Sequence, residues 1–169
     1  MTIGSMYADV AEFHQKFGLH QRDHGKLLPL EFMRMRLKRQ LEEVDELAKA
    51  LAQRDILQVT DALVDITYIA LGNAWLLNVP FEESWEEVHA ANMRKERAVK
   101  ANASKYGSTY DIIKPVGWEP PNLSRFIAPE DLILKVPRPA KTEQHDLVDY
   151  LNELKGHEEH EQATRNHTN

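Results

Sequence analysis

Apolar residues recur at three- and four-residue spacing from residue 5 to residue 104, and glycine and proline fall mainly between the periodic stretches. This spacing puts apolar side chains on one face of a helix and differs from the alternation of a strand. Short connections between helices favour antiparallel neighbours, so the predicted fold class is all-α, a four-helix bundle-like arrangement. The predicted helices lie at about residues 6–17, 29–54, 55–77 and 81–97.

The chain changes character after residue 102, where prolines, glycines and aromatic residues are interspersed. Aromatic residues beside prolines pack onto a neighbouring surface more often than they stay in water, so we predict an ordered extended arm here. The tail from Gly156 holds no large apolar residue and is predicted to be disordered. The expected division is a helical domain over residues 1–123, a C-terminal arm with one short helix over residues 124–155 and a disordered tail over residues 156–169.

Composition narrows the classes to which this chain can belong. It has 169 residues, no cysteine and a formal net charge of −6. The missing cysteines exclude disulfide scaffolds, thiol catalysis and cysteine-ligated zinc, and they fit a reducing compartment. The negative charge disfavours broad contact with a nucleic-acid backbone, and no apolar run reaches the roughly 18 residues of a membrane span. We expect a soluble cytoplasmic protein with neither nucleic acid nor membrane as a partner.

The predicted helix at residues 55–77 is apolar around nearly its whole circumference, so we expect it to be buried on most sides. One narrow stripe differs, because Asp61 and Asp65 are four residues apart and lie on the same face. Two buried like charges repel each other and need positive compensation. A doubly charged cation is the simplest partner for such a pair.

The preceding helix has an acidic face formed by Glu42, Glu43 and Glu46. Taken alone, such a face is typical of solvent exposure. The short Arg54-Asp55 connection makes the two helices neighbours, however, which allows both acidic faces to converge. Oxygen-only ligands favour hard ions such as Mg²⁺ or Mn²⁺, with two or more ions offsetting the carboxylate charge. Because such ions keep open positions for phosphate oxygens, a nucleotide is a natural ligand.

Basic and amide side chains that could hold phosphates occur on two of the predicted helices. Asn92 and Lys95 continue the inward side of the helix at residues 81–97, although Lys95 could instead extend past Trp85 into water. Arg39 lies on the acidic side of the second helix. We expect Lys95 and Arg39 to hold outer phosphates and Asn92 to donate a directional hydrogen bond.

Three motifs together resemble those of a known family. They are Glu42-Glu43-x-x-Glu46, Asp61-x-x-x-Asp65 and His89-x-x-Asn92-Met93-x-Lys95. This pattern resembles the MazG-like nucleoside triphosphate pyrophosphohydrolases of the all-α NTP pyrophosphatase superfamily, and most closely the compact phage and integron-type members. The likeness covers about residues 5–123, which include the Phe13-His14 pair and the Pro120-Pro121-Asn122-Leu123 segment.

The resemblance implies a catalytic domain that hydrolyses a nucleoside triphosphate to the monophosphate and pyrophosphate with Mg²⁺ or Mn²⁺, as a homodimer or homotetramer. By that likeness Glu43, Glu46 and Asp65 would be metal ligands, and Asp61 and Glu42 would either bind metal or position the attacking water. Either Glu42 or Glu43 would act as the base. Many family members carry Glu three residues before the final Asp, but this chain has Ala62 at that position and its acid at Asp61.

Three further residues are candidates for substrate binding, each with a structural alternative. His14 could contact the base or sugar, or could be a satisfied histidine of the core. Trp118 could stack on a nucleobase, or could anchor the core or a subunit interface. Tyr68 extends the polar stripe of its helix and could bind the sugar, or could hydrogen-bond between helices.

Two other functions compete with hydrolysis. Glu86-x-x-His89 would suit a ferritin-like di-iron carboxylate protein, but that site needs two such pairs and the chain has one. A non-catalytic nucleotide-binding helical bundle would keep the metals without turnover. The phage-type resemblance favours a purine deoxynucleotide such as dGTP as substrate, with hydrolysis of damaged nucleotides as the other possibility. A phage-encoded protein would work in the host cytoplasm.

Overall fold

The computed structural model describes residues 2–23 and 28–126. Within them lie four helices, which confirm the all-α class: α1 (Ile3–Lys16), α2 (Leu30–Gln53), α3 (Ile56–Leu76) and α4 (Phe81–Met93). The short strands β1 (Glu96–Arg97) and β2 (Ile112–Ile113) and the 3-10 helices η1 (Ala101–Ala103) and η2 (Leu123–Phe126) follow. The helix predicted within residues 124–155 and the tail at 156–169 lie outside the described residues, apart from the end of η2.

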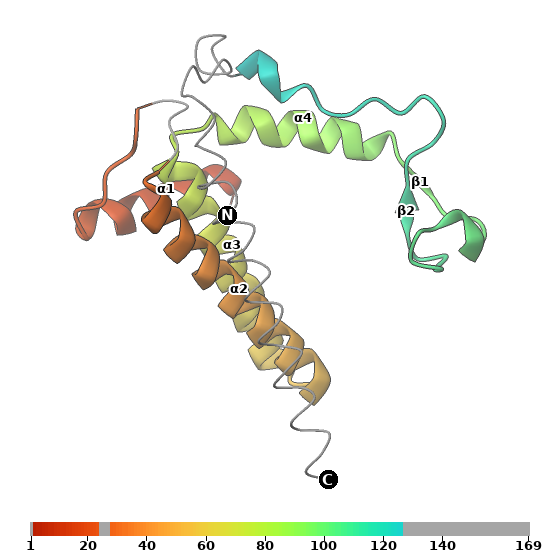
Figure 1. Ribbon diagram of the computed structural model, residues 1–169, viewed down its shortest axis with the longest axis horizontal. Helices are drawn as coiled ribbons and strands as arrows, with labels where there is room; N and C mark the ends of the chain where they lie inside the picture. Colours follow the sequence, from red (N-terminus) through yellow and green to blue (C-terminus); the bar gives the residue numbers. More distant parts are fainter. Residues whose placement is uncertain (1, 24–27, 127–169) are drawn as a thin grey trace.

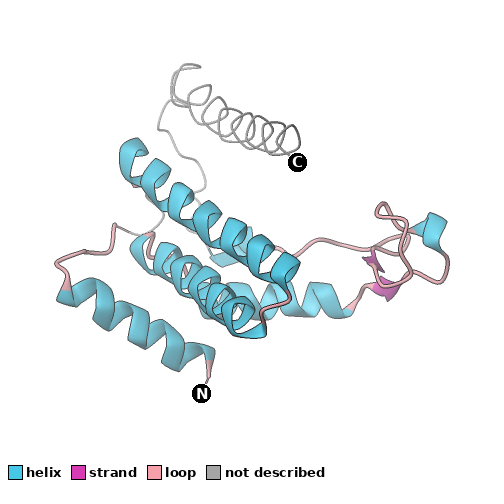
Figure 2. Ribbon diagram, turned by 90° about the horizontal axis from the view of Figure 1, so that it is seen from below, coloured by secondary structure: helices cyan, strands magenta, loops and turns pink. Residues whose placement is uncertain are grey.

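Helices α1, α2 and α3 lie side by side, and α3 packs against both of the others (Figures 1 and 2). The turn between α2 and α3 follows the predicted connection: Arg54 adopts a left-handed backbone with φ of 57°, and Asp55 caps α3. The Asp55 carboxylate accepts hydrogen bonds from the backbone N–H groups of Leu57 and Gln58 at 3.0 and 3.2 Å. This tight connection holds α2 and α3 antiparallel along their length.

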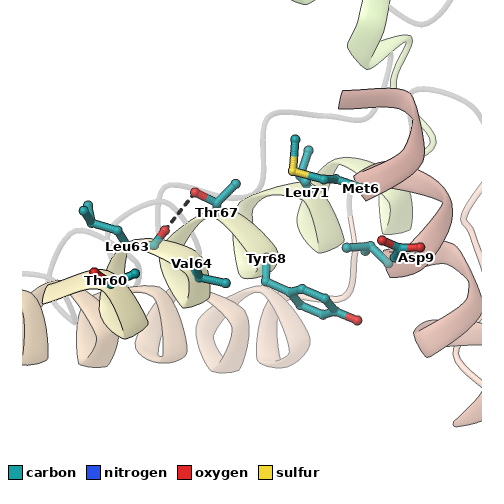
Figure 3. Close-up of a pocket in the computed structure, with 9 residues that line it drawn as sticks. Met6, Asp9, Thr60, Leu63, Val64, Thr67, Tyr68 and Leu71 are labelled. Atoms are coloured by element: carbon teal, nitrogen blue, oxygen red, sulfur yellow. Dashed lines mark hydrogen bonds between the residues drawn. The ribbon is translucent and has the colours of Figure 1, made fainter. Parts of the chain in front are cut away.

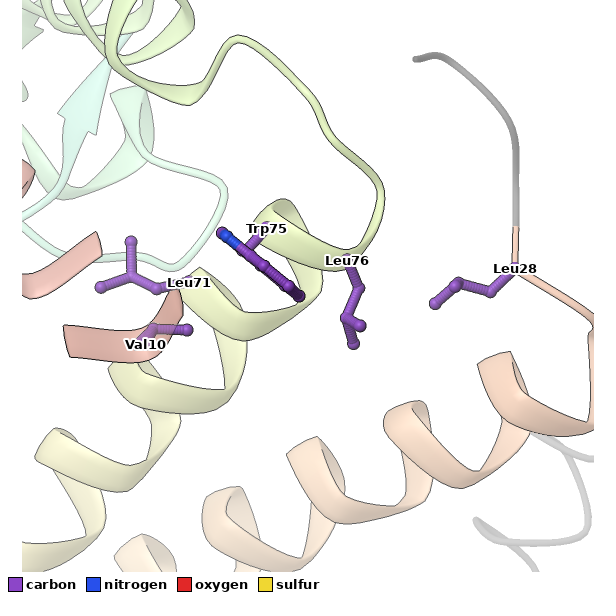
Figure 4. Close-up of a cluster of buried hydrophobic side chains, with 5 residues drawn as sticks. All are labelled: Val10, Leu28, Leu71, Trp75 and Leu76. Atoms are coloured by element: carbon purple, nitrogen blue, oxygen red, sulfur yellow. The ribbon is translucent and has the colours of Figure 1, made fainter. Parts of the chain in front are cut away.

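The core lies where α1 crosses the C-terminal half of α3 (Figure 4). It is built from aliphatic side chains around one tryptophan: Val10, Leu28, Leu71, Trp75 and Leu76. Because these residues gather at one end of the α2 and α3 pair, the other end of that pair depends on contacts between the two helices themselves.

The sequence led us to expect that the fourth helix runs antiparallel along the other three. Helix α4 does not. Its first residue, Phe81, stacks on Tyr7 of α1 with ring centroids 6.0 Å apart, and the helix then extends away from α1, α2 and α3 (Figure 1). It also ends at Met93, not near residue 97. The reason is a long-range pairing, because Glu96–Arg97 pairs with Ile112–Ile113 as an antiparallel two-stranded ribbon.

The segment after β2 is ordered, as predicted, and folds back along α4. The Trp118 indole N–H donates to the carbonyl oxygen of Ala91 at 2.8 Å. At the middle of α4, Glu87 accepts from the backbone N–H of Asn122 at 3.1 Å and pairs with Arg125 at 2.9 Å. These contacts attach the arm to one face of α4.

Helix α3 is less buried than its apolar composition predicted. Its N-terminal half leaves Ile56, Leu57 and Val64 exposed by 76, 73 and 57%. Met6, Val10, Leu63, Val64, Thr67 and Leu71 are among the residues of an apolar groove of about 570 Å³ between α1 and α3 (Figure 3). The expectation fails because the described residues supply neighbours for only part of the circumference of α3. No helix in the described ranges has both the length and the apolar character that crossing a bilayer requires.

Candidate active site

Side-chain hydrogen bonds across α2 and α3 fix how the two helices align. Arg36 donates from Nε to Asn73 Oδ1 at 2.6 Å and from Nη2 to the carbonyl oxygen of Ile69 at 3.1 Å. One turn further along α2, Gln40 donates to the carbonyl oxygen of Ile66 at 3.2 Å. Continuing this antiparallel alignment by one more turn brings the acidic face of α2 opposite the acidic stripe of α3.

Glu43 is the centre of the acidic cluster that the sequence predicted. Its Oε2 atom is buried and has no hydrogen-bond partner among the described residues. Burial raises the pKa of Glu43, and the nearby charges of Asp65, Glu46, Glu42 and Asp61, in that order, raise it further. The charges of all four other carboxylates therefore act on Glu43, and Glu43 and Asp65 line the same cavity.

The structure corrects one part of that prediction, because Asp61 and Asp65 are not a buried pair. Both are exposed to solvent, as are Glu42 and Glu46, and only Glu43 is partly buried. Asp61 lies against a shallow depression with Leu57 and Val64, and not in the cavity that contains Glu43. The apolar residues expected to bury the two aspartates remain exposed themselves in a single chain.

Ala62 occupies the position at which many members of the MazG-like family carry an acidic residue. Ala62 is 3% exposed and packs inside the helix layer, whereas the adjacent Asp61 points to solvent. A carboxylate at residue 62 would need a cation or hydrogen bonds to offset its desolvation. Asp61 contributes negative potential to Glu43 from the rim instead.

The donor set of this cluster fits a hard divalent cation, since it consists of carboxylates and includes one oxygen that is buried without a partner. Within residues 2–23 and 28–126, however, no three acidic or histidine side chains already lie close enough together to hold a metal ion. The carboxylates converge without forming a ready cage, so binding an ion requires side-chain rotations that draw them inward.

A cavity of about 380 Å³ opens beside this cluster where α1, α2 and α3 meet. It places three predicted substrate-binding residues, His14, Arg39 and Tyr68, beside the predicted ligands Glu43 and Asp65. Burial and the charges of Asp9 and Glu12 raise the pKa of Tyr68, which keeps its phenol protonated as a donor. The lining residues are Phe13, His14, Arg36, Arg39, Glu43, Asp65, Tyr68 and Ile69.

His14 is buried, at 1% exposure, but it is only half satisfied. Its Nδ1 lies 2.7 Å from the carbonyl oxygen of Val10, and its Nε2 has no partner among the described residues. Burial lowers the pKa of His14, the bond to Val10 raises it and the charge of Arg36 lowers it. The side chain is therefore neither a purely structural core histidine nor a surface group.

The structure does not bring Asn92, Lys95 and Trp118 to the carboxylates of the same chain. Asn92 lies near the end of α4, which extends away from α2 and α3, and Lys95 lies beyond that end, not on an inward helix face (Figure 1). The Lys95 Nζ atom lies 5.7 Å from the centre of the Trp118 ring, and the Nζ of Lys114 lies 4.5 Å from it. Lys95, Lys114 and Trp118 therefore form a separate basic and aromatic group where the segment after β2 lies against the end of α4.

The pair that prompted the di-iron alternative also lies on α4. Glu86 and His89 are exposed on this helix, which extends away from the other three and faces no second pair of that kind among residues 2–23 and 28–126 (Figure 1). The arrangement therefore lacks the surrounding helices that a ferritin-like centre needs.

Sequence reasoning missed Arg36 and Gly72. Arg36 shares a face of α2 with Arg39, Gln40 and Glu43, and this spacing of three, four and seven residues was the available signal. Gly72 is buried beneath the cavity, where an added Cβ atom would lie 2.8 Å from Arg36 Nη2 and 2.8 Å from His14 Cε1. No sequence signal separates this close approach from an ordinary helical glycine.

Comparison with known proteins agrees with this geometry. Residues 10–92 match the phosphoribosyl-ATP pyrophosphohydrolase family, and this range contains every residue of the cavity. A search of curated protein sequences found no significant match. Residues 10–92 therefore form a phosphoribosyl-ATP pyrophosphohydrolase family domain of the MazG-like all-α NTP pyrophosphatase superfamily, which makes this protein a nucleotide pyrophosphohydrolase.

Proposed function

We propose that the protein hydrolyses a (deoxy)nucleoside triphosphate to the monophosphate and pyrophosphate with Mg²⁺ or Mn²⁺, and that it prefers a purine deoxynucleotide such as dGTP. The observation that carries this proposal is the buried, unpartnered Oε2 atom of Glu43, in a cavity that also contains Asp65 and Arg39. Carboxylates suit a divalent cation, and a guanidinium suits a phosphate. Their presence in one cavity favours a metal-bound polyphosphate as ligand.

We assign each side chain a role in this reaction. Glu43, Glu46 and Asp65 would hold the ions, with Asp61 and Glu42 at the rim either adding a ligand or positioning water. When bound, the ions would neutralise charge on the triphosphate and lower the pKa of water.

Within this arrangement Glu43 or Glu42 takes the proton of the attacking water. Arg39 holds an outer phosphate through charge-assisted hydrogen bonds, and the protonated phenol of Tyr68 donates to the substrate.

We also propose that the working form is a homodimer or homotetramer. One chain leaves the N-terminal half of α3 uncovered and carries Asn92, Lys95 and Trp118 away from its own carboxylates. A second copy covering α3 would remove that apolar surface from water. It would also bring basic residues of its own α4 and arm to the phosphates.

The activity is tested with a panel of canonical and modified nucleoside triphosphates, together with phosphoribosyl-ATP, assayed with Mg²⁺ and with Mn²⁺. Phosphoribosyl-ATP is the second candidate substrate because it defines the matched family. Equal amounts of monophosphate and pyrophosphate from dGTP support the proposal. Release of free phosphate and the nucleoside diphosphate would mean that the enzyme cleaves the bond between the β- and γ-phosphates instead. Binding without turnover would favour the non-catalytic bundle.

Replacing Val64 by Asp tests the oligomer. Because Val64 lies on the uncovered face of α3, we expect the charge to convert the oligomer to a monomer in light scattering and to lower kcat/KM at least about tenfold. Val99→Asp is the matched control, since Val99 is 90% exposed outside α3 and should change neither mass nor activity. A wild-type protein that is monomeric and fully active would contradict the proposal.

A further inference from the structure

The cavity where α1, α2 and α3 meet is lined by charges of both signs. Glu43 and Asp65 supply its acids, and Arg36 and Arg39 supply two guanidinium groups from α2. Residues three apart are neighbours on one face of a helix, so the two arginines flank the same part of the cavity. The proposed function assigns Arg39 to an outer phosphate but gives Arg36 no role.

The arginines and the acids do not neutralise each other. Arg36 and Arg39 form no ion pair with any described residue, although Glu43 follows Arg39 by four residues, a spacing that permits a salt bridge. The charges that act on Glu43 are those of other carboxylates, and they raise its pKa. Burial lowers the pKa of Arg36, and the like charge of Arg39 lowers it further. Each set of charges therefore lacks its counter-charge.

Arg36 is held in place by neutral acceptors only. Its Nε donates to Asn73 Oδ1 at 2.6 Å, and its Nη2 donates to the carbonyl oxygen of Ile69 at 3.1 Å. Gly72 permits this close approach to α3, because an added Cβ atom would lie 2.8 Å from Arg36 Nη2. Neither hydrogen bond uses Nη1, so the guanidinium keeps donors for a ligand. A partly buried cation with spare donors is stabilised by an anion.

Two guanidinium groups on one side of a cavity suit a phosphate better than a carboxylate. Each guanidinium presents parallel N–H donors that match two oxygens of a phosphate. A terminal phosphate has three such oxygens and up to two negative charges, so it can engage both arginines at once. Because Arg36 is already anchored to α3, it loses little side-chain entropy on binding.

We infer that Arg36 and Arg39 together form a phosphate-binding subsite, which holds the outer phosphate of the substrate directly and without an intervening metal ion. Arg36 is thereby a further substrate-binding residue. The inference deepens the proposed function and rests on it for the identity of the nucleotide. Binding of a phosphate to the arginines is measurable without metal and without turnover, so the two can fail separately.

The test measures the dissociation constant of pyrophosphate by calorimetry, with the full-length protein in excess chelator. Pyrophosphate is the probe because it carries the outer phosphate without a nucleoside. We expect saturable binding of pyrophosphate, and binding of acetate that is at least about tenfold weaker. An absence of binding without divalent ions, or equally tight binding of acetate, overturns the inference.

Arg36→Gln removes the charge and the spare donors. Pyrophosphate should then bind at least about tenfold more weakly, which is the loss expected for a hydrogen bond between charged groups. Lys38→Gln is the matched control, because it removes the same charge from an exposed residue of α2 outside the cavity. It should change the affinity by less than about twofold. Unchanged affinity of Arg36→Gln overturns the inference.

A purely structural role of Arg36 leads to a different result. Asn73→Ala removes the acceptor of Arg36 Nε but keeps the guanidinium in the cavity. If Arg36 only ties α2 to α3, Asn73→Ala and Arg36→Gln should weaken pyrophosphate binding equally, which overturns the inference. If Arg36 binds phosphate, Asn73→Ala should weaken it by less than about threefold.

Arg36→Lys serves as the test if Arg36→Gln does not fold by circular dichroism. It keeps the charge but loses the planar fork, so we expect pyrophosphate to bind at least about threefold more weakly. The rise in Tm on adding Mg²⁺ should be kept, because the acids of the cavity are intact. Wild-type affinity for pyrophosphate in Arg36→Lys, or loss of the Mg²⁺ effect together with that affinity, overturns the inference.

Turnover separates the inference from the proposed function. If pyrophosphate binds through Arg36 but no triphosphate releases pyrophosphate, the proposed function fails and the phosphate subsite stands. If dGTP is hydrolysed, Arg36→Gln should raise KM with little change in kcat. If it changes neither, the inference fails and the proposed function stands. Weaker binding of dGMP with unchanged binding of pyrophosphate would place Arg36 at the inner phosphate and also overturn the inference.

Discussion

Replacing Glu43 by Gln lowers kcat/KM for pyrophosphate release by about 10³-fold, within the range for loss of a general base or a metal-binding carboxylate. Glu43 is the one acid of the cluster whose carboxylate oxygen is buried without a partner. Gln keeps the size of the side chain but cannot carry the negative charge. The assay follows pyrophosphate from dGTP at saturating Mg²⁺.

The same variant should be more stable than the wild type when no divalent ion is present. Because burial and four neighbouring carboxylates raise the pKa of Glu43, the folded state holds its proton more tightly than the unfolded state. Stability contributed by protonated Glu43 is therefore complete below its ordinary pKa and is lost as pH rises through the raised value. Each like-charged pair costs ~0.2–0.5 kcal/mol, so removing all four pairs should raise Tm by roughly 2–8 °C at pH 7.

Asp45→Asn is the matched control for both effects. Asp45 lies on the same helix but pairs with Lys49, so this variant loses the same charge outside the cluster. It should keep near-normal turnover and gain no stability. The gain in Tm of Glu43→Gln should also shrink as the pH falls well below the ordinary pKa of the carboxyl, where Glu43 is protonated in both states. Near-normal activity of Glu43→Gln would remove this residue from the reaction.

Removing divalent ions with a chelator abolishes pyrophosphate release, and adding Mg²⁺ or Mn²⁺ restores it. The carboxylates of α2 and α3 repel each other and form no ready cage in the described residues, so we expect cations to draw them together and to hold the triphosphate. A ligand at 100 times its Kd stabilises by about 2.7 kcal/mol, which corresponds to a rise in Tm of roughly 5–10 °C.

The position of the metal is checked by comparing how much Mg²⁺ raises the Tm of the two variants Glu43→Gln and Asp45→Asn. Glu43→Gln should lose most of the rise in Tm on adding Mg²⁺, whereas Asp45→Asn should keep it. Full turnover after complete chelation, verified by elemental analysis, would refute metal dependence. Equal stabilisation of both variants would place the ions elsewhere.

That Glu43 and Asp65 lie near each other was predictable, because it depends on features that are local in the sequence. Helical periodicity assigns Glu43 and Asp65 to faces of their helices, and the capped Arg54-Asp55 turn makes those helices adjacent. The exposure of the acids was not predictable, because it depends on what covers α3. A sequence pattern shows that Val64 is apolar, but not whether the same chain or a second copy buries it.

The direction of α4 depends on pairing between distant residues. The Ala98 N–H donates to the carbonyl oxygen of Asp111 at 2.9 Å, and this pairing takes the chain out of the helix before Lys95. Helix propensity at residues 94–97 carries no information about a strand 15 residues later. The phosphate-binding role of Lys95 within one chain was therefore an expectation that periodicity could not test.

The sequence by itself determined the four helices and the tight turn between α2 and α3, since each follows from spacing along the chain. Only the tertiary structure decided that His14 presents a free Nε2 beside Arg36 above Gly72. Those atoms come from three helices, and their donor and acceptor roles arise from distances that no spacing along one helix fixes.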